Sequence, residues 1–132
     1  MAKVKSVTLL SFTLPNKIGQ LAAVAEALGA ANVNITALRA TDVGSNAEFL
    51  VGVKNPNKAL KALAPLSADV KQAEALCIEV PNKAGRLQKV AKKLAAAGVN
   101  IQSSWSTAFT GKTASCIMVT ADDKKARAAL KK

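Results

Sequence analysis

The sequence has no histidine and no tyrosine, and aromatic residues make up only 3% of its 132 residues. Histidine is the side chain that most often acts as a general base, a metal ligand or a pH switch near neutrality. Acidic residues are also scarce, because 8 Asp and Glu stand against 19 Lys and Arg, which gives a formal charge of +11. None of the carboxylates lies beside a plausible nucleophile or base. We therefore expect a protein without catalytic activity, metal site or cofactor.

The sequence has few cysteines and no long apolar run. Its two cysteines are Cys77 and Cys116. No stretch approaches the run of about 18 apolar residues that a membrane-spanning helix needs. The first six residues carry Lys3 and Lys5 and are not followed by the apolar region of a secretory signal. We expect a cytoplasmic, globular protein with reduced thiols and no membrane association.

The chain contains the same segment twice, displaced by 66 residues. Residues 15–35 align with residues 81–101, and 13 of these 21 positions are identical. Farther along, the apolar pattern alone continues the alignment and sets three residues of the first copy over three of the second: Phe49, Val51 and Val53 over Ser115, Ile117 and Val119. Two copies of one structural unit therefore make up the protein.

Each copy has the pattern of a strand, a helix, a hairpin and a second helix. Residues that alternate with period two before Pro15 and Pro81 predict a strand that ends at each proline. A stripe at i, i+3, i+4 and i+7, starting at Leu21 and Leu87, predicts an amphipathic helix. We expect these helices to end at two glycines, Gly29 and Gly98.

The hairpins and the second helices have their own signals. Polar turn residues at 43–46 and 110–112 separate segments rich in β-branched residues. Asn55-Pro56-Asn57 predicts a helix start, and Pro65 stops that helix. In the second copy, Asp122-Asp123 begins a helix that runs to Lys132.

This order predicts an α+β fold made of two tandem ferredoxin-like βαββαβ repeats, with antiparallel sheets and helices on one face. Residues 1–72 form the first module and residues 73–132 the second. In the first module, residues 68–74 supply a closing strand that runs into the first strand of the second module. The second module ends without residues for its final strand. It therefore stays three-stranded, or the long strand that begins at Met1 takes the empty place.

The loop after the first strand is the most faithfully repeated part outside the predicted core. It has the sequence Asn-Lys-x-Gly in both copies. A glycine exposes backbone N–H groups at the helix start, where the helix dipole also favours a carboxylate or phosphate. An amide side chain both donates and accepts hydrogen bonds, so it suits a zwitterion. A second amide, Asn34 or Asn100, starts the next strand of each copy.

Each of these residues also has a purely structural interpretation. Asn16 and Asn82 are good helix N-caps. Gly19 and Gly85 allow a helix to approach the sheet closely. Asn34 and Asn100 tolerate the left-handed backbone that turns a chain out of a helix. At the level of the sequence, the structural and ligand-binding interpretations both remain open.

The repeated loop, the helix and the Val-Asn-Ile motif at residues 33–35 and 99–101 resemble the ACT domain, an amino-acid-sensing module of biosynthetic enzymes. The resemblance covers nearly the whole chain and implies a stand-alone tandem ACT protein that regulates by binding an amino acid. In ACT domains the ligand lies between two modules, with the loop of one facing the second strand of the other. The common loop has Pro before the Gly, where Ile18 and Ala84 stand here. The implied ligand-binding residues are Asn16, Lys17, Ile18, Gly19, Gln20, Asn34, Asn82, Lys83, Ala84, Gly85, Arg86 and Asn100.

The two cysteines fall on strands that are neighbours in a ferredoxin-like sheet. We expect both side chains on the sheet face away from the helices, as two small packed thiols and not a metal site. Trp105 stands where the first copy has Arg39, and it either covers this face or stacks on a ligand.

The outer faces of the two first helices have diverged. Cations crowd the second copy, whereas alanines dominate the first: Lys83, Arg86, Lys89, Lys92 and Lys93 against Ala22, Ala23, Glu26 and Ala27. The basic side would attract nucleic acid or an acidic protein, and the alanine side permits close packing in a homodimer. The aromatic residues Phe12 and Phe49 fall on the helix side, so the sheet lacks a base-stacking pair, and a solvated basic face is the simpler interpretation. Amino-acid binding with a partner enzyme, nucleic-acid binding and a ligand-free oligomerisation scaffold are the three functional hypotheses.

Overall fold

The computed structural model describes residues 3–67, 69–107 and 111–131. Its elements follow in the order β1, α1, β2, β3, α2, β4, α3, β5, β6, α4. They divide into two compact units. The first unit is Thr8–Ala73, and the second is Glu74–Lys132 together with Met1–Val7. Each unit contains one copy of the sequence repeat.

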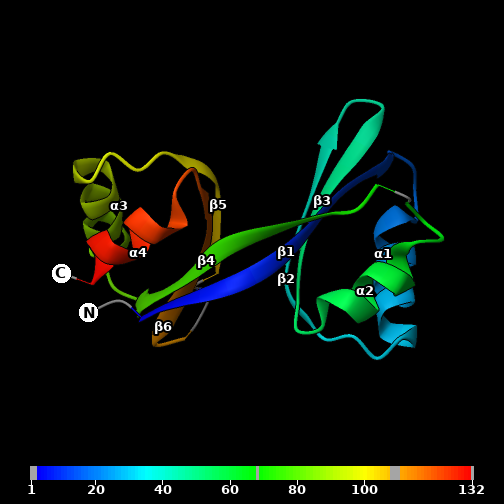
Figure 1. Cartoon of the computed structure of the whole chain (residues 1–132), viewed down its shortest axis with the longest axis horizontal. Helices are drawn as coiled ribbons and strands as arrows, with labels where there is room; N and C mark the ends of the chain where they lie inside the picture. Colours follow the sequence, from blue (N-terminus) through cyan, green and yellow to red (C-terminus); the bar gives the residue numbers. More distant parts are fainter. Residues whose placement is uncertain (1–2, 68, 108–110, 132) are drawn as a thin grey trace. The chain divides into compact units, whose positions relative to one another are not determined.

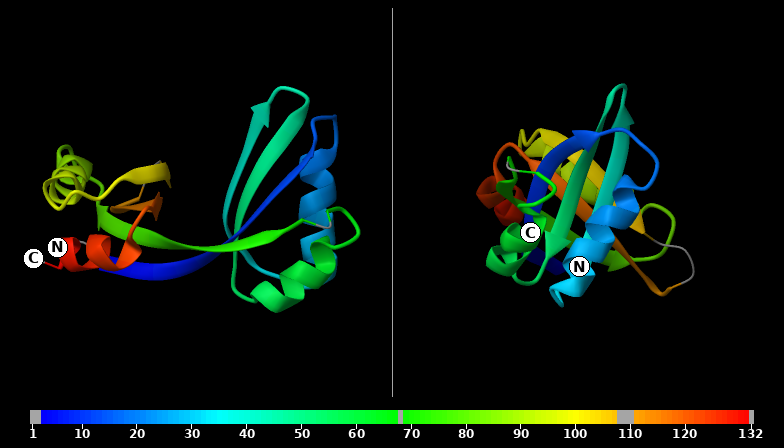
Figure 2. Two further views of the ribbon diagram at one scale, coloured as in Figure 1. Left: turned by 45° about the horizontal axis from the view of Figure 1, so that its top comes forward. Right: turned by 90° about the vertical axis from the view of Figure 1, so that its right-hand side faces the viewer.

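The first unit consists of an antiparallel sheet with both helices on one face (Figures 1 and 2). The strand order is β2-β3-β1, and the beginning of β4 follows β1. This is the predicted ferredoxin-like arrangement. The elements are β1 (Lys3–Pro15), α1 (Gln20–Ala30), β2 (Ile35–Val43), β3 (Asn46–Val53), α2 (Pro56–Leu63) and β4 (Lys71–Pro81).

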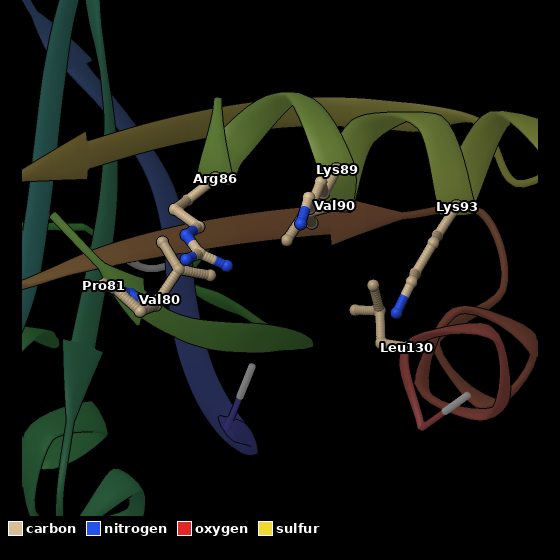
Figure 3. A pocket seen from close by; sticks show the side chains of 7 residues that line it. All are labelled: Val80, Pro81, Arg86, Lys89, Val90, Lys93 and Leu130. Atoms are coloured by element: carbon tan, nitrogen blue, oxygen red, sulfur yellow. The ribbon is translucent and has the colours of Figure 1, made fainter. Parts of the chain in front are cut away.

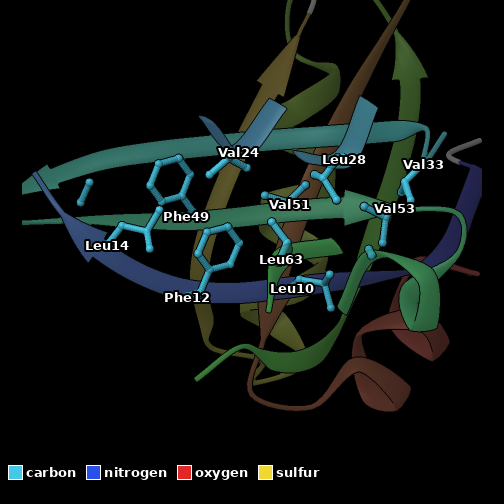
Figure 4. Packing of buried hydrophobic residues seen from close by; sticks show 12 residues of the cluster. Leu10, Phe12, Leu14, Val24, Leu28, Val33, Phe49, Val51, Val53 and Leu63 are labelled. Carbon is cyan, nitrogen blue, oxygen red and sulfur yellow. The ribbon is translucent and has the colours of Figure 1, made fainter. Parts of the chain in front are cut away.

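The core of the first unit lies between the sheet and the two helices (Figure 4). Alternate residues of β1 point into it, as the period of two predicts: Leu10, Phe12 and Leu14 are all buried. The Phe12 and Phe49 rings stack with their centroids 5.1 Å apart. On α1 the predicted stripe is confirmed at Val24 and Leu28, which are buried, and is wrong at Leu21, which is 49% exposed, and at Ala25, which is also exposed.

The second unit repeats this architecture with the strand order β4-β6-β5 and both helices again on one face (Figure 1). The beginning of β1 supplies the strand next to β4. Val4 packs against the core of this unit, and Arg127 Nη1 donates to the Val4 carbonyl at 3.3 Å. The long first strand thus occupies the place that the end of the chain leaves empty. The remaining elements are α3 (Arg86–Ala96), β5 (Ile101–Thr107), β6 (Thr113–Thr120) and α4 (Asp123–Leu130).

Strand β4 runs unbroken from Lys71 to Pro81. The closing strand of the first copy and the opening strand of the second are therefore one strand, as the sequence predicts. Its start at Lys71 is later than the expected start at residue 68, which lies outside the described residues.

The second helix of each unit begins as predicted. The Asn55 side chain caps α2 by accepting a hydrogen bond from the Lys58 amide at 3.2 Å. The Asp122 side chain caps α4 by accepting from the Lys125 amide at 3.0 Å. Helix α2 ends at Leu63, just before Pro65, and α4 ends at Leu130. These ends place short amphipathic helices over the core.

The prediction that Gly29 ends the first helix is wrong. Helix α1 continues through Gly29 to Ala30. The left-handed residue that follows is Asn32, with φ of 59°, and the second unit has Gly98 at the matching position with φ of 73°. Asparagine tolerates this backbone better than most side chains, so the two copies use different residues for one turn. The turning role considered for Asn34 therefore belongs to Asn32.

The predicted register of the second hairpin is wrong by one residue. The Asn16 amide donates to the Ser45 carbonyl, whereas the Asn82 amide donates to the Lys112 carbonyl. The asparagines are 66 residues apart and the carbonyls 67, so the second hairpin contains one extra residue. A shift of one residue moves every side chain of a strand to the opposite face. The residues of β6 that join the core are therefore Ala114, Cys116 and Met118, and not Ser115, Ile117 and Val119.

This shift separates the two cysteines. Cys77 pairs with Ile117, whereas Cys116 pairs with Ile78 and is buried in the core under the helices. The prediction for Cys116 is therefore wrong, and the two thiols point to opposite faces of the sheet. Trp105 also pairs with Ile117, which puts it on the same face as Cys77, where it is half-buried.

We predict that Cys77 reacts slowly with thiol reagents in the native protein and that Cys116 reacts only after unfolding. Burial raises the pKa of Cys77, and the Glu79 carboxylate raises it further, while Lys5 acts in the opposite direction. Because the thiolate is the reactive form, Cys77 should react with Ellman's reagent at pH 8 more slowly than free cysteine, and faster as the pH rises. Cys116 is 3% exposed and should react only after unfolding. Two equally fast thiols in the native protein would contradict this burial.

Candidate functional site

The repeated asparagine of each loop ties that loop to the hairpin turn of its own unit. Asn16 Nδ2 donates to the Gly44 carbonyl at 3.2 Å. Asn82 Nδ2 donates to the Gly111 carbonyl at 2.9 Å in the same way. Neither asparagine is an N-cap, because the N-cap residues of α1 and α3 are Gly19 and Gly85. The capping interpretation is therefore wrong, and the duplicated amide fixes the distance between the loop and the turn.

The repeated glycine is required by backbone conformation. Gly19 has φ of +93° and Gly85 has φ of +84°, a region that L side chains rarely adopt. A Cβ added at either glycine would meet no atom within 4 Å. Close packing of helix against sheet is therefore not the reason for glycine. The space in front of both residues is open, and no side chain caps α1 or α3.

In the first unit the loop borders a pocket of about 230 Å³. Four of the predicted site residues line it together: Asn16, Lys17, Gly19 and Gln20. The opposite wall comes from the end of β2 and the start of β3, with Ala40, Thr41, Asp42, Ala47 and Phe49. Ile18 is not among the lining residues, and its side chain is fully exposed.

Residues of both charge signs line the pocket. Lys17, whose side chain ends in an ammonium group, and Asp42, whose side chain ends in a carboxylate, are both among the lining residues. Asp42 Oδ1 accepts a hydrogen bond from the Gly44 amide at 2.9 Å, which orients the carboxylate. Gln20 Nε2 donates to the Pro15 carbonyl at 2.9 Å and holds the loop against the start of α1. No side chain caps α1, and the Gln20 amide donates to the Lys17 carbonyl at 3.3 Å, so the partial positive charge at this edge comes from the first-turn amides that follow Gln20.

The strand-start asparagines lie elsewhere within each unit. Asn34 immediately precedes β2, whereas the pocket contacts β2 at residues 40–42. Seven residues of extended strand span roughly 23 Å, so Asn34 does not line the pocket of its own unit. Asn34 and Asn100 are both exposed, and their carbonyls accept from the Lys54 and Ala121 amides.

The loop of the second unit borders a different hollow of about 390 Å³. Its lining contains three predicted residues, Ala84, Gly85 and Arg86, with Lys89 and Lys92 beside them. Asn82 and Lys83 are not part of this lining. In sequence, the position that corresponds to Asp42 is Ala108, which lies outside the described residues. An alanine at this position does not supply the carboxylate that Asp42 supplies in the first unit.

The contribution of β2 and β3 to the pocket was not predicted from the sequence. Asp42 and Thr41 line the pocket because β2 ends beside the loop, across the turn that Asn16 holds. One signal was available in the sequence: Asp42 immediately precedes the turn at 43–46, and this turn leads into β3, the strand that pairs with β1, at whose end the loop begins. Loop composition alone does not show it.

Within the described residues, no group of three or more His, Cys, Asp or Glu side chains is placed to hold a metal ion. No helix there has the length and apolar character to cross a bilayer.

Comparison with known proteins adds a family and several structural relatives. The family model described as an ACT domain pair matches residues 5–131. Protein BT0572 from Bacteroides thetaiotaomicron has 32% sequence identity and a TM-score of 0.84, over 97% of this chain and 88% of its own. No curated protein matches the chain.

Two structures with lower identity share the fold. The ligand-free regulatory subunit of aspartate kinase from Thermus thermophilus has a TM-score of 0.74 at 20% identity, over 98% of this chain and 93% of its own. Aspartate kinase from Synechocystis has a TM-score of 0.65 at 21% identity, over 98% of this chain and 25% of its own. The same fold thus occurs as a separate subunit and as part of a larger enzyme.

Proposed function

Because the chain belongs to the ACT domain pair family, we propose that it is a non-catalytic regulatory protein that binds a free amino acid. The observation that carries the proposal is the pocket of the first unit, where Lys17 and Asp42 present opposite charges. A zwitterion matches such a pair, whereas a simple anion or cation would be repelled by one of them.

The polar groups around the pocket support one orientation of the ligand. The α-carboxylate lies against the first turn of α1, near Gly19 and the Lys17 ammonium. The α-ammonium lies against the Asp42 carboxylate, while Asn16 keeps its Oδ1 as an acceptor because Nδ2 is used by Gly44. Phe49, together with the two alanines of the pocket wall, offers apolar contact to a side chain.

The volume of the pocket limits the size of that ligand. A cavity of about 150 Å³ holds a benzene-sized molecule, so the pocket of about 230 Å³ accepts a small or medium-sized amino acid. Few atoms make contact, so we expect a Kd on the order of micromolar to millimolar.

Regulation requires that the bound state differ from the free state in a way a partner can detect. The ligand would bridge the loop at 16–20 and the end of β2, which Asn16 already joins through Gly44. Binding would thus favour one position of the loop and of the exposed residue Ile18 beside it. A second copy of the chain or a partner enzyme would respond to that position. The existence of a structural relative described as a regulatory subunit supports this proposal.

We predict that calorimetry against the twenty amino acids gives binding to one or a few of them. Asp42→Asn should weaken that binding by at least about 10-fold, because it removes the charge that faces the ammonium, a loss of about 1.4 kcal/mol or more. Glu48→Gln is the matched control: Glu48 is an exposed carboxylate next to Asp42 in the sheet and does not line the pocket.

Two results would refute the proposal. One is the absence of a binding signal for any amino acid at millimolar concentration. The other is an unchanged Kd in Asp42→Asn. A decrease in affinity in both variants would show only a general charge effect, and the assignment of Asp42 would then fail.

A further inference from the structure

Helix α3 differs in charge from its counterpart α1, although the two occupy the same position in their units. In α3 four cations stand where α1 has neutral or acidic residues: Arg86, Lys89, Lys92 and Lys93 in place of Gln20, Ala23, Glu26 and Ala27. The buried positions are nevertheless the same type, with Val90 and Leu94 in place of Val24 and Leu28. The fold therefore does not require the cations.

Three of these cations line one pocket of the second unit, with a volume of about 160 Å³ (Figure 3). Arg86 and Lys93 extend from α3 at its two ends, and Lys89 lies between them. The floor is apolar and comes from three elements: Val80 and Pro81 of β4, Val90 of α3 and Leu130 of α4. None of the described residues that line it has an acidic side chain.

This arrangement is electrostatically unfavourable for the helix itself. Arg86 is the first residue of α3, and the first turn contains no acidic residue. Cations near a helix N-terminus oppose the helix dipole. Arg86 and Lys89 are also three residues apart, a spacing at which like charges on a helix face each other. A bound anion would remove both costs, and sites that break local rules in this way are often functional.

We propose that this pocket binds a compact anion, namely a small phosphorylated molecule with a short apolar part. The Arg86 guanidinium offers the planar, two-pronged donor set that suits phosphate oxygens, and Lys89 adds a second positive charge. The apolar floor of Val80, Val90 and Leu130 contacts the carbon part of the ligand. The site is separate from the Asp42 pocket and does not depend on the amino-acid proposal.

Size favours a small ligand over a nucleic-acid strand. The pocket volume of about 160 Å³ matches a phosphate group with a few carbon atoms. Surfaces that bind a nucleic-acid strand instead need an extended basic groove with aromatic side chains for base stacking. Among its described residues, the second unit has one aromatic residue, Trp105, which lies on the sheet face away from the helices. Single-stranded nucleic acid is the alternative ligand, and its binding is one of the results that the experiment below measures.

The test uses the full chain, at low salt, with inorganic phosphate, butyl phosphate and butanol as probes in calorimetry and thermal shift. Butyl phosphate should bind about 5-fold more tightly than inorganic phosphate, because part of its chain contacts the apolar floor, and butanol should not bind. The double variant Arg86→Gln, Lys89→Ala copies the residues of α1. It should weaken butyl phosphate binding by at least 10-fold.

The same double variant also tests whether Arg86 and Lys89 bind a ligand or only stabilise the fold. Without ligand it should melt at the same temperature as the wild type or about 1–3 °C higher, because charge repulsion is relieved. Lys124→Ala is the control, since Lys124 is an exposed cation in the first turn of α4 and does not line the pocket. It should bind butyl phosphate like the wild type. Asp42→Asn should also bind it normally, which keeps this proposal distinguishable from the amino-acid site.

Three results would overturn the proposal. The first is wild-type affinity for butyl phosphate in the double variant. The second is equal binding of butyl phosphate and butanol. The third is tight binding of a single-stranded oligonucleotide that Lys92→Ala weakens as much as Lys89→Ala does. Because Lys92 lies outside this pocket, that result would indicate a surface that binds polyanions.

Discussion

Replacing Phe49 by alanine should lower the free energy of unfolding by about 3–5 kcal/mol. Phe49 is 2% exposed, stacks on Phe12 and belongs to the core between the sheet and helices α1 and α2 (Figure 4). The truncation removes the transfer energy of the ring and leaves a cavity that Val24 and Val51 cannot fill without backbone movement. Small domains have only about 5–15 kcal/mol of stability in total, so a large part of it would be lost.

Urea denaturation followed by far-ultraviolet circular dichroism measures this change, since it reports on helices and strands of both copies. Leu38→Ala is the control, because Leu38 lies on β2 and is 37% exposed; its cost should stay below about 1 kcal/mol. Equal losses from the two variants would mean that the core between sheet and helices does not carry the stability of this unit.

The elements of the fold were predictable because their signals are local. The period of two in β1, the cap at Asn55 and the proline that follows α2 each depend on neighbours within a few residues. The internal repeat added independent support, because each element was seen twice. The family resemblance then agreed with an order of elements already derived from these patterns.

The roles of the loop residues were not predictable for a physical reason. Asn16 bonds to a turn 28 residues away, so its partner depends on the pairing of β1 with β3. Local rules favour capping, because asparagine is a good N-cap, but Gly19 takes the N-cap position with a positive φ. Asp42 lines the pocket for a related reason, because β2 pairs with β3, and β3 pairs with β1. Contacts across a sheet edge thus decide the site, and they are not encoded in the loop alone.

The register of β6 shows how one residue changes the chemistry of a face. The strand pairings place the extra residue between positions 107 and 113, where sequence similarity between the copies has ended. Pattern alone was equally compatible with both registers, since apolar residues occupy both Ile117 and Met118. The hydrogen bond from the Asn82 amide to the Lys112 carbonyl fixes the choice.

This register leads to a second strong prediction, in which lysine substitutions at two positions of β6 have opposite outcomes. Met118 is 2% exposed and lies in the core of the second unit. Met118→Lys would bury an unpaired charge and lose apolar contact, which together cost more than about 4 kcal/mol and should unfold this unit at room temperature.

Ser115→Lys should be tolerated, with a change within about 0.5 kcal/mol, because Ser115 lies on the other face directly opposite Glu79 and gains a cross-strand partner of opposite charge. Trp105 is the only tryptophan and lies on β5, so its fluorescence during urea denaturation reports on this unit. In the register predicted from the sequence, Ser115 would face the core and Met118 would not, and the two outcomes would be exchanged. The pair of variants therefore decides between the registers even if one of them fails to fold, because only the lysine that faces the core is expected to abolish the folded state.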